Sequence, residues 1–327
     1  MIVLWCDADE YDFEYYKKVE SYGIRVIPVK YSLDSREIQY MDNLRSVDAI
    51  VISYVNTKVD AFLLEKYKNL KLIVTRSTGC DHIDLTYCKQ RGIKVCSLDG
   101  YSTVATAEYT VSLILNLLKN HKSILMRVSQ GVFQREIHTD LKGKKVGVVG
   151  TGRIGSYVSK LLMCFGAEIL CWSFTEREDL KKVGAKYVSL QELYKSSDII
   201  TFHVRLSEQT KYLFNKDSLN MVKRGVFVVN TSRAGVVEIE AIYEGLRTGI
   251  ISGCALDCFE EEDYFIRGAN YEDANKLRIL TEILKHPRVI ITPHNAFNSI
   301  ESKNRDLEYT TETLINYFKN GHCLFEC

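Results

Sequence analysis

The chain carries near its middle the stretch Val146-Gly147-Val148-Val149-Gly150-Thr151-Gly152-Arg153-Ile154-Gly155, in which an apolar run leads directly into G-x-G-x-x-G. A helical pattern follows, and a second apolar run lies at 168–172. This strand, turn and helix are the context of a dinucleotide-binding fingerprint. Gly150 permits the tight turn, Gly152 lets the backbone approach a pyrophosphate, and Gly155 lets the helix pack on the strand. The phosphates are expected at the positive end of that helix.

Composition limits the classes of function that fit the chain. Its 327 residues leave room for about two domains, and 46% hydrophobic residues indicate a compact fold. The net charge of +1 and the lack of a long basic run disfavour nucleic acid as a partner. No apolar stretch reaches membrane-spanning length, and 1–6 is too short for a signal peptide. We therefore expect a cytoplasmic protein with small-molecule partners and no metal.

The ten cysteines do not form a recognisable metal or redox motif. They are scattered, and the nearest pairs, Cys254 with Cys258 and Cys323 with Cys327, lack the two-residue gap of such motifs. We interpret them as small buried hydrophobic residues in a reducing compartment.

The first hundred residues alternate short apolar runs with amphipathic segments, which predicts a parallel sheet covered by helices. The predicted strands are Ile2–Trp5, Arg25–Val29, Ala49–Ser53, Leu72–Thr75 and Lys94–Ser97. The predicted helices are Glu10–Tyr22, Val59–Tyr67 and Leu85–Arg91.

The same rhythm returns after the fingerprint, and six predicted strands match a complete dinucleotide-binding sheet. They are Lys145–Val149, Glu168–Trp172, Ile199–His203, Val226–Asn230, Ile251–Leu256 and Val289–Thr292. The pattern of residues Thr103–Arg127 predicts one long helix. Its apolar face would serve as a brace between the domains, as a dimer contact, or as both. A last helix, 299–318, is expected to return to the first domain.

These patterns predict an α/β fold with two Rossmann-like or flavodoxin-like parallel-sheet domains and the active-site cleft between them. We expect residues 1–100 and 297–327 to form a substrate domain, and 101–296 to form the dinucleotide-binding domain. The chain would then cross between the two domains twice, and a hinge of two chain segments suits a cleft that closes on its substrate.

Four further motifs resemble the D-isomer-specific 2-hydroxyacid dehydrogenase family, and together they extend the resemblance over nearly the whole chain. They are Arg76-Ser77-Thr78-Gly79-Cys80-Asp81-His82-Ile83-Asp84, Asn230-Thr231-Ser232-Arg233-Ala234-Gly235, Ala255-Leu256-Asp257-Cys258-Phe259-Glu260-Glu261-Glu262 and Thr292-Pro293-His294-Asn295-Ala296-Phe297. The last three follow predicted strands at the edge where ligands bind in open α/β sheets.

The resemblance implies an oxidoreductase whose catalytic residues are Arg233, Glu262 and His294. Arg233 offers a planar fork for a substrate carboxylate. His294 can supply the proton that a reduced carbonyl needs, and Glu262 would orient its ring and raise its pKa. The family's catalytic glutamate is the last acid of D-x-x-E-x-E, which favours Glu262 over Glu260 and Glu261. Taken alone, such an arginine and such a glutamate run would more often be surface residues.

The resemblance also implies contacts with cofactor and substrate. From the resemblance we expect cofactor contacts at Arg153, Ile154, Val204, Thr210, Thr231, Ser232, Arg233, Asp257 and His294, beside Gly150, Gly152 and Gly155 of the fingerprint. We also expect contacts at Ser173, Arg177 and Arg205, where the chain departs from the family pattern. The substrate contacts are Tyr54, Thr78, Gly79, Tyr101, Arg233, His294 and Phe297, with the amides of Thr78 and Gly79 as the carboxylate grip. His82 and His203 are competing histidines for which a structural role is equally expected.

The cofactor is NAD(H) or NADP(H). The acid that normally holds the adenosine ribose should follow Trp172, but Ser173 stands there. Arg177 could bind a 2′-phosphate, and Arg205 adds a cation beside the adenine pocket. The alternative is that Glu176 reaches the ribose.

For the substrate, the long segment after Glu262, with Tyr264-Phe265-Ile266-Arg267, and the aromatic Phe297 resemble the D-lactate dehydrogenase branch. We expect a small 2-oxo acid, with pyruvate favoured and a D-2-hydroxyisocaproate dehydrogenase as the alternative. Glu262 argues against formate dehydrogenases, which pair their histidine with glutamine. A corepressor that senses NAD(H) without turnover is the alternative from a different class. The long helix predicts a homodimer.

Overall fold

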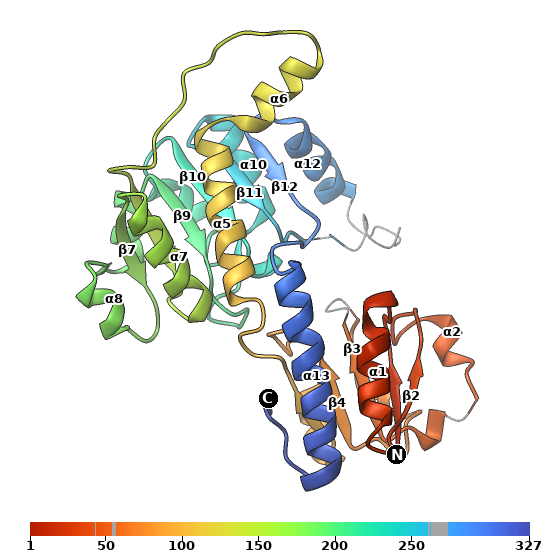
Figure 1. The fold of residues 1–327 in the computed structure, drawn as a ribbon. Coiled ribbons are helices and arrows are strands. Elements are labelled where there is room, and N and C mark those ends of the chain that lie inside the picture. The colour runs from red at the N-terminus through yellow and green to blue at the C-terminus, as the bar shows by residue number, and fades with distance from the viewer. Residues whose placement is uncertain (43, 54–56, 261, 263–273) are drawn as a thin grey trace. The chain divides into compact units, whose positions relative to one another are not determined.

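The computed structural model of the protein describes residues 1–42, 44–53, 57–260, 262 and 274–327. The chain forms two units, one of residues 1–102 and 299–327 and the other of residues 103–298 (Figure 1). Each boundary lies two residues further along the chain than the sequence suggested. The two units are described separately below, and the cleft expected between them stays a prediction.

The first unit contains five parallel strands in the order β2-β1-β3-β4-β5, which is the flavodoxin-like order. The strands are β1 (Ile2–Trp5), β2 (Arg25–Pro28), β3 (Ala49–Ile52), β4 (Leu72–Thr75) and β5 (Lys94–Cys96). Every residue of the central strands β3 and β4 is buried. Strands covered on both faces require continuous apolar runs, so their positions could be read from the sequence.

The helices of the first unit are α1 (Phe13–Glu20), α2 (Arg36–Gln39), α3 (Ala61–Leu64), α4 (Leu85–Gln90) and α13 (Ile300–Asn320). Short 3₁₀ turns occupy Glu10–Asp12 and Leu44–Ser46. The helix predicted over 59–67 is wrong except for α3, because Val59 forms a parallel bridge with Ile83 instead.

Helix α13 brings the end of the chain back to the first unit, where it packs against α1 and β4. A buried ion cluster fastens it there. The Arg76 guanidinium donates to Asp306 on α13 at 2.9 and 2.7 Å, and to Asp12 at 3.3 Å. Removing one member of such a buried cluster would leave an uncompensated charge, so the cluster makes this docking specific.

Two cysteines of the first unit correct the expectation from sequence. Cys80 and Cys327 form a disulfide across a sequence separation of 247 residues. The other eight cysteines are free, and six of these are buried, as expected for small apolar side chains. No spacing rule connects residues so far apart, so the sequence could not indicate this pairing.

The second unit contains seven parallel strands in the order β12-β11-β10-β9-β6-β7-β8, a Rossmann order extended by one strand. The strands are β6 (Lys145–Val149), β7 (Glu168–Trp172), β8 (Lys186–Tyr187), β9 (Ile199–Phe202), β10 (Val226–Asn230), β11 (Ile251–Leu256) and β12 (Val289–Ile291). Strand β8 was not predicted because its two residues form no apolar run.

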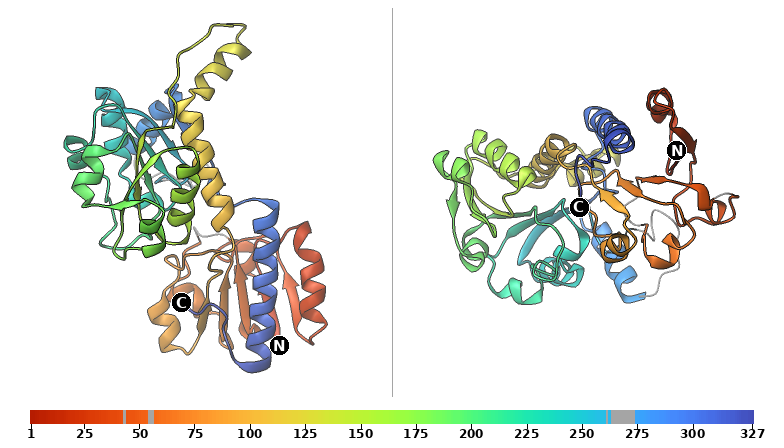
Figure 2. Two further views of the ribbon diagram at one scale, coloured as in Figure 1. Left: turned by 60° about the vertical axis from the view of Figure 1, so that its left-hand side comes forward. Right: turned by 90° about the horizontal axis from the view of Figure 1, so that it is seen from below.

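Helices cover both faces of this sheet (Figure 1, Figure 2). The helices of the second unit are α5 (Thr103–Leu118), α6 (His121–Ser129), α7 (Arg153–Cys164), α8 (Glu178–Lys182), α9 (Leu190–Ser196), α10 (Ile239–Thr248) and α12 (Ala274–Lys285), of which α6 does not cover the sheet. The apolar side chains of α5 and α7 pack in one core cluster, and those of α9, α10 and α12 pack in a second one. Among the described residues no helix combines the length and apolar character needed to span a membrane.

The long helix predicted over 103–127 is wrong in one respect, because it breaks between α5 and α6. Asn120 adopts a left-handed backbone conformation with φ of 54°, which asparagine tolerates better than most residues. Its side chain donates to Glu136 at 2.8 Å. Helix α6 buries none of its residues and extends away from the sheet, as both views show (Figure 1, Figure 2).

Candidate active site

The glycine-rich turn joins β6 to α7 at the carboxyl edge of the second sheet. Gly150 has φ of +94°, and a Cβ there would lie 2.7 Å from Val204 Cγ1. A Cβ on Gly155 would lie 1.9 Å from the Gly150 carbonyl oxygen. At Gly152, which precedes the first residue of α7, a Cβ would meet nothing within 4 Å. The open space before an α-helix without a capping side chain fits a pyrophosphate bound at its N-terminus.

The loop after β9 lies beside this turn and is held by its own hydrogen bonds. The buried Thr210 hydroxyl donates to the Arg205 carbonyl at 2.5 Å and accepts from the Ser207 backbone N–H at 2.8 Å. Thr210 therefore shapes the loop on which Val204 and Arg205 lie. His203 is half-buried here, and the loss of solvation lowers its pKa to about 3. A histidine that stays neutral cannot act as a proton donor near neutral pH.

The segment after β7 has no carboxylate directly at the strand end, as the sequence indicates. Ser173 is half-buried there. Arg177 donates to Asp179 at 2.9 Å, and Glu176 forms an ion pair with Lys181 at 2.7 Å. Both side chains on which the choice of cofactor was expected to depend thus have partners of opposite charge within the chain.

The end of β10 carries Arg233 on a turn built by Asn230. This buried asparagine donates to the Arg233 carbonyl at 2.9 Å and accepts from the Ser232 hydroxyl at 2.8 Å. Thr231 shares a hydrogen bond of 2.8 Å with Thr110 of α5. After Arg233 the chain makes a 3₁₀ turn, Ala234–Val236. Asn230 is a positioning residue that the sequence reading did not assign, although a buried asparagine at a strand end is a detectable signal.

Asp257, at the end of β11, organises the loop that carries His294. Its carboxylate accepts from the Thr292 hydroxyl at 2.6 Å and from the backbone N–H groups of Asn295 and Ala296 at 2.8 and 2.9 Å. Its own carbonyl accepts from the His294 backbone N–H at 2.9 Å. These bonds hold His294 at φ of 52°, an unusual conformation for a residue other than glycine.

The His294 ring is paired with Glu262. Nδ1 of His294 lies 3.0 Å from Oε1 of Glu262, a side chain that is only 8% exposed. Burial of the ring would lower its pKa, but contacts with Cys258 and with the Glu262 carboxylate raise the pKa of His294 to about 11. The Cys258 thiol also donates to the Ser232 carbonyl at 3.6 Å, so it links the two loops.

The three residues predicted to be catalytic are therefore carried by the ends of neighbouring strands, with His294 and Glu262 in direct contact. Glu260 has a different role, because it accepts from the Tyr212 hydroxyl at 2.5 Å and pairs with Lys276 at 3.2 Å. This arrangement offers a charged proton donor and a nearby arginine on one sheet edge. It suits the reduction of a carbonyl next to a carboxylate.

Of the predicted substrate residues, Phe297 packs beside His294. Its ring centroid lies 6.1 Å from that of His294 in an edge-on arrangement. Tyr54 lies outside the described residues, as does 264–267. Tyr101, in the first unit, is 4% exposed and donates to the Arg76 carbonyl at 3.4 Å, which favours a structural role.

Thr78 and Gly79 lie in the loop after β4, which we call the 76–84 loop. The Ser77 hydroxyl donates to the Gly79 carbonyl at 2.6 Å and shares a hydrogen bond of 2.8 Å with Thr75. Thr75 also contacts His82 Nε2 at 3.2 Å. The loop is thus shaped by its own side chains, and Thr78 and Gly79 are half-buried at its start.

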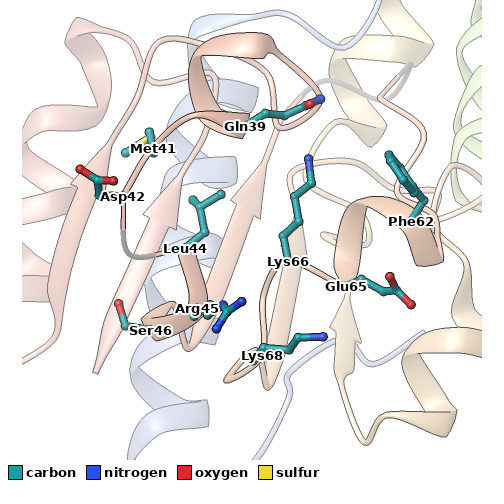
Figure 3. A pocket seen from close by; sticks show the side chains of 10 residues that line it. All are labelled: Gln39, Met41, Asp42, Leu44, Arg45, Ser46, Phe62, Glu65, Lys66 and Lys68. Carbon is teal, nitrogen blue, oxygen red and sulfur yellow. The ribbon is translucent and has the colours of Figure 1, made fainter.

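A surface cavity of about 630 Å³ lies elsewhere in the first unit (Figure 3). It is lined by Gln39, Met41, Asp42, Leu44, Arg45, Ser46, Phe62, Glu65, Lys66 and Lys68. These residues precede β3 and β4 in the chain, at the amino ends of the strands, whereas ligands of open α/β sheets bind at the carboxyl ends. Within the described ranges, no group of three or more His, Cys, Asp or Glu side chains is arranged to hold a metal ion.

Comparison with known proteins connects this geometry to a family. A family model for the D-isomer specific 2-hydroxyacid dehydrogenase NAD binding domain matches residues 111–296. A D-specific alpha-keto acid dehydrogenase of Enterococcus faecalis is 35% identical over 76% of each chain. An aromatic 2-oxoacid reductase of Clostridium sporogenes is 34% identical over 80% of each chain. The D-lactate dehydrogenase of Aquifex aeolicus, solved with NAD and lactic acid, superposes with a TM-score of 0.89 at 34% identity, over 97% of this chain and 95% of that one.

Proposed function

The chain belongs to the D-isomer specific 2-hydroxyacid dehydrogenase family and is an NAD-dependent oxidoreductase, and from this premise we propose that it reduces a small 2-oxo acid, with pyruvate favoured, to the D-2-hydroxy acid. The observation that carries the proposal is the His294–Glu262 pair at 3.0 Å, on the same sheet edge as Arg233. A raised pKa keeps His294 protonated at neutral pH, which is the form that reduction consumes.

The reaction follows from the roles of these side chains. Bound NADH supplies the hydride. Arg233 binds the substrate carboxylate and polarises the neighbouring carbonyl. His294 donates its proton to the oxygen on which negative charge develops, and Glu262 stabilises the imidazolium before transfer. In the oxidation direction the neutral ring takes the proton back.

The substrate proposal rests on Phe297, whose ring lies next to His294 and would narrow the space for the substrate side chain. A panel of pyruvate, hydroxypyruvate, 2-oxoisocaproate and phenylpyruvate tests it by kcat/KM. We expect pyruvate to be preferred, and Phe297→Ala to shift the preference toward the larger acids. A preference of the unaltered enzyme for hydroxypyruvate or phenylpyruvate would contradict the proposal. Cofactor binding without turnover of any of them would instead favour a sensor that recruits partners.

We propose that the enzyme accepts NADP(H) as well as NAD(H). The absence of a carboxylate directly after β7 removes repulsion of a 2′-phosphate, but Asp179 holds Arg177 at 2.9 Å. An exposed pair of this kind contributes little, so a phosphate can compete with Asp179. Asp179→Asn should raise kcat/KM for NADPH about two- to fivefold, because it releases Arg177. Arg177→Gln is the matched control and should lower it. If neither variant changes the ratio of NADPH to NADH efficiency, Arg177 does not contact the cofactor.

We propose a homodimer in which helix α6 and the segment after it form the contact. This arm exposes several large apolar side chains, namely Leu125, Met126, Val128, Val132, Phe133 and Ile137. Phe133 is 84% and Ile137 is 97% exposed, which is unusual for a monomer surface. Light scattering of the unaltered protein should give twice the mass of one 37.5 kDa chain. The double variant Phe133→Asp, Ile137→Asp should give the mass of a single chain. A monomeric unaltered protein would contradict this proposal.

We also propose that the enzyme is cytoplasmic. Its cofactor and small 2-oxo acids are metabolites of that compartment, and the majority of its cysteines are free thiols. Cell fractionation with an activity assay tests the location, and activity confined to an extracytoplasmic fraction would contradict it.

A further inference from the structure

The last residues of the chain pair with the edge of the first sheet through an antiparallel bridge between Cys96 and Glu326. Strand β5 is the last strand in the order, so one of its edges has no partner within the sheet. The 322–327 segment covers it. The Ser97 N–H donates to the Phe325 carbonyl at 3.0 Å, and the Cys327 N–H donates to the Val95 carbonyl at 2.9 Å. An ion pair between Lys94 and Glu326 at 2.8 Å adds a contact between side chains.

The disulfide ties this segment to the loop after β4. Cys80 directly follows Gly79 in the 76–84 loop, and its sulfur is bonded to that of Cys327. The 322–327 segment is also held by two backbone hydrogen bonds, by the packing of Cys323 against the core and by the Phe325 ring, whose centroid lies 5.5 Å from that of Tyr309. The bond is thus the covalent connection between a peripheral segment and the loop proposed to bind substrate.

Accessibility makes this bond a target for exchange. Cys327 is exposed and Cys80 is half-buried, whereas six of the free cysteines are buried. Exposed disulfides are the labile ones, and in a reducing compartment a disulfide is usually transient or regulatory. From the geometry we propose that Cys80 and Cys327 form a thiol–disulfide modification site that sets the affinity of the 76–84 loop for the 2-oxo acid. This inference rests on the proposed function.

The loop is where such a change would act. The amides of Thr78 and Gly79 are the proposed carboxylate donors, and the bonded Cys80 is the next residue. The ends of the loop are held by β4 and by the Val59–Ile83 bridge, and the disulfide fixes the middle of the loop, at Cys80, to the 322–327 segment. Donors that are already in position bind an anion with less loss of conformational entropy. Reduction releases the middle of the loop beside Thr78 and Gly79, so it should weaken substrate binding.

The oxidant that forms the Cys80–Cys327 bond is a low-molecular-weight disulfide such as glutathione disulfide. The Cys327 thiolate attacks one glutathione sulfur, a mixed disulfide forms, and the other glutathione leaves as a thiolate. The Cys80 thiolate then attacks the Cys327 sulfur and releases the second glutathione. Two cysteine thiols are oxidised, one glutathione disulfide is reduced, and the two protons are taken up by the two departing glutathione thiolates.

The experiment compares the full-length enzyme after equilibration with glutathione disulfide and with dithiothreitol. Thiol titration of the denatured protein should give eight and ten thiols, because the chain has ten cysteines and eight are free. Reduction should raise KM for pyruvate about three- to tenfold, with a smaller change in kcat and none in the Kd for NADH. Cys327→Ser should show, in both buffers, the higher KM of the chemically reduced enzyme. Cys164→Ser, which removes an exposed cysteine of the second unit, should respond as the unaltered enzyme does.

A binding measurement separates this inference from the function on which it rests. Oxamate, a non-reacting analogue of pyruvate, should bind to the NADH complex of the oxidised enzyme more tightly than to that of the reduced enzyme. By linkage, saturating oxamate must then make the disulfide harder to reduce by the same factor. Ten thiols in the oxidising buffer, or equal oxamate affinity in both states, would overturn the inference. No turnover of any 2-oxo acid, with the redox-dependent oxamate affinity intact, would overturn only the proposed function.

Discussion

The carboxyl edge of the second sheet has two halves that are built from different chemical groups. At β6 and β9 the chain presents a glycine turn, the start of a helix and a half-buried neutral histidine. At β10, β11 and β12 it presents Arg233, Glu262 and His294, which are ionisable side chains at adjoining strand ends. The first half suits the binding of phosphates by backbone groups, and the second suits proton transfer.

The two histidines show how neighbours decide between these roles. His203 and His294 are both largely removed from water, yet the pKa is lowered to about 3 in one and raised to about 11 in the other. Burial acts alone on His203, whose Nε2 contacts only the neutral Thr201 hydroxyl among the described hydrogen-bonding groups. His294 has the Glu262 carboxylate at 3.0 Å. Contacts with Cys258 and with the Glu262 carboxylate, and not burial, therefore set the pKa of His294 apart from that of His203.

The largest difference in activity is expected between variants in which His294 or His203 is replaced. His294→Ala removes the proton donor and should lower kcat/KM for pyruvate by about 10³-fold or more, with the Kd for NADH unchanged. His203→Asn should leave kcat/KM within about threefold, because a neutral side chain is retained there. Steady-state kinetics and fluorescence titration with NADH measure both. A large loss of turnover in His203→Asn alone would reverse the assignment.

Two glycines of the phosphate-binding half, Gly155 and Gly152, can likewise be compared by substitution. At Gly155 a Cβ would overlap the Gly150 carbonyl at 1.9 Å, so Gly155→Ala should destabilise the second unit by about 2–4 kcal/mol. At Gly152 a Cβ meets no protein atom within 4 Å, so Gly152→Ala should fold normally and weaken NADH binding by about tenfold. Thermal unfolding and NADH titration distinguish them. Equal losses of stability would mean that both glycines act only in packing.

A smaller change is expected when the charge of the carboxylate is removed and its shape is kept. In Glu262→Gln the His294 pKa should fall toward its ordinary value of about 6.5. Reduction needs the protonated ring, so its alkaline limb should move to lower pH, and the rate at about pH 8 should fall by tenfold or more. Oxidation needs the neutral ring and should lose less there. A pH profile identical to that of the unaltered enzyme would show that Glu262 does not control the proton.

Much of this edge could be predicted from the sequence, for identifiable physical reasons. Buried parallel strands need uninterrupted apolar runs, so β6, β10 and β11 were predicted with the bounds that the structure has. The glycine turn could also be predicted, because its conformation and packing exclude residues other than glycine. The break at Asn120 was missed, since an asparagine inside a helical pattern lowers helix propensity only slightly.

The supporting contacts could not be read in this way. Asp257 was predicted to contact the cofactor, whereas the structure shows its carboxylate holding the His294 loop through hydrogen bonds from residues 35 to 39 positions away. The disulfide joins residues 247 positions apart. Such pairings depend on how the strands are ordered in each sheet, which an apolar pattern does not contain.

The central claim is that the contacts of His294 with Cys258 and Glu262 raise its pKa against the effect of burial and make it the proton donor. Nitrogen-15 NMR of the histidine rings, recorded from about pH 5 to 9, measures this in the resting enzyme. We expect the His294 ring to stay protonated on both nitrogens throughout and the His203 ring to stay neutral throughout, with Glu262→Gln bringing only the His294 titration into that range. A His294 ring that titrates near its ordinary pKa in the unaltered enzyme would contradict the account.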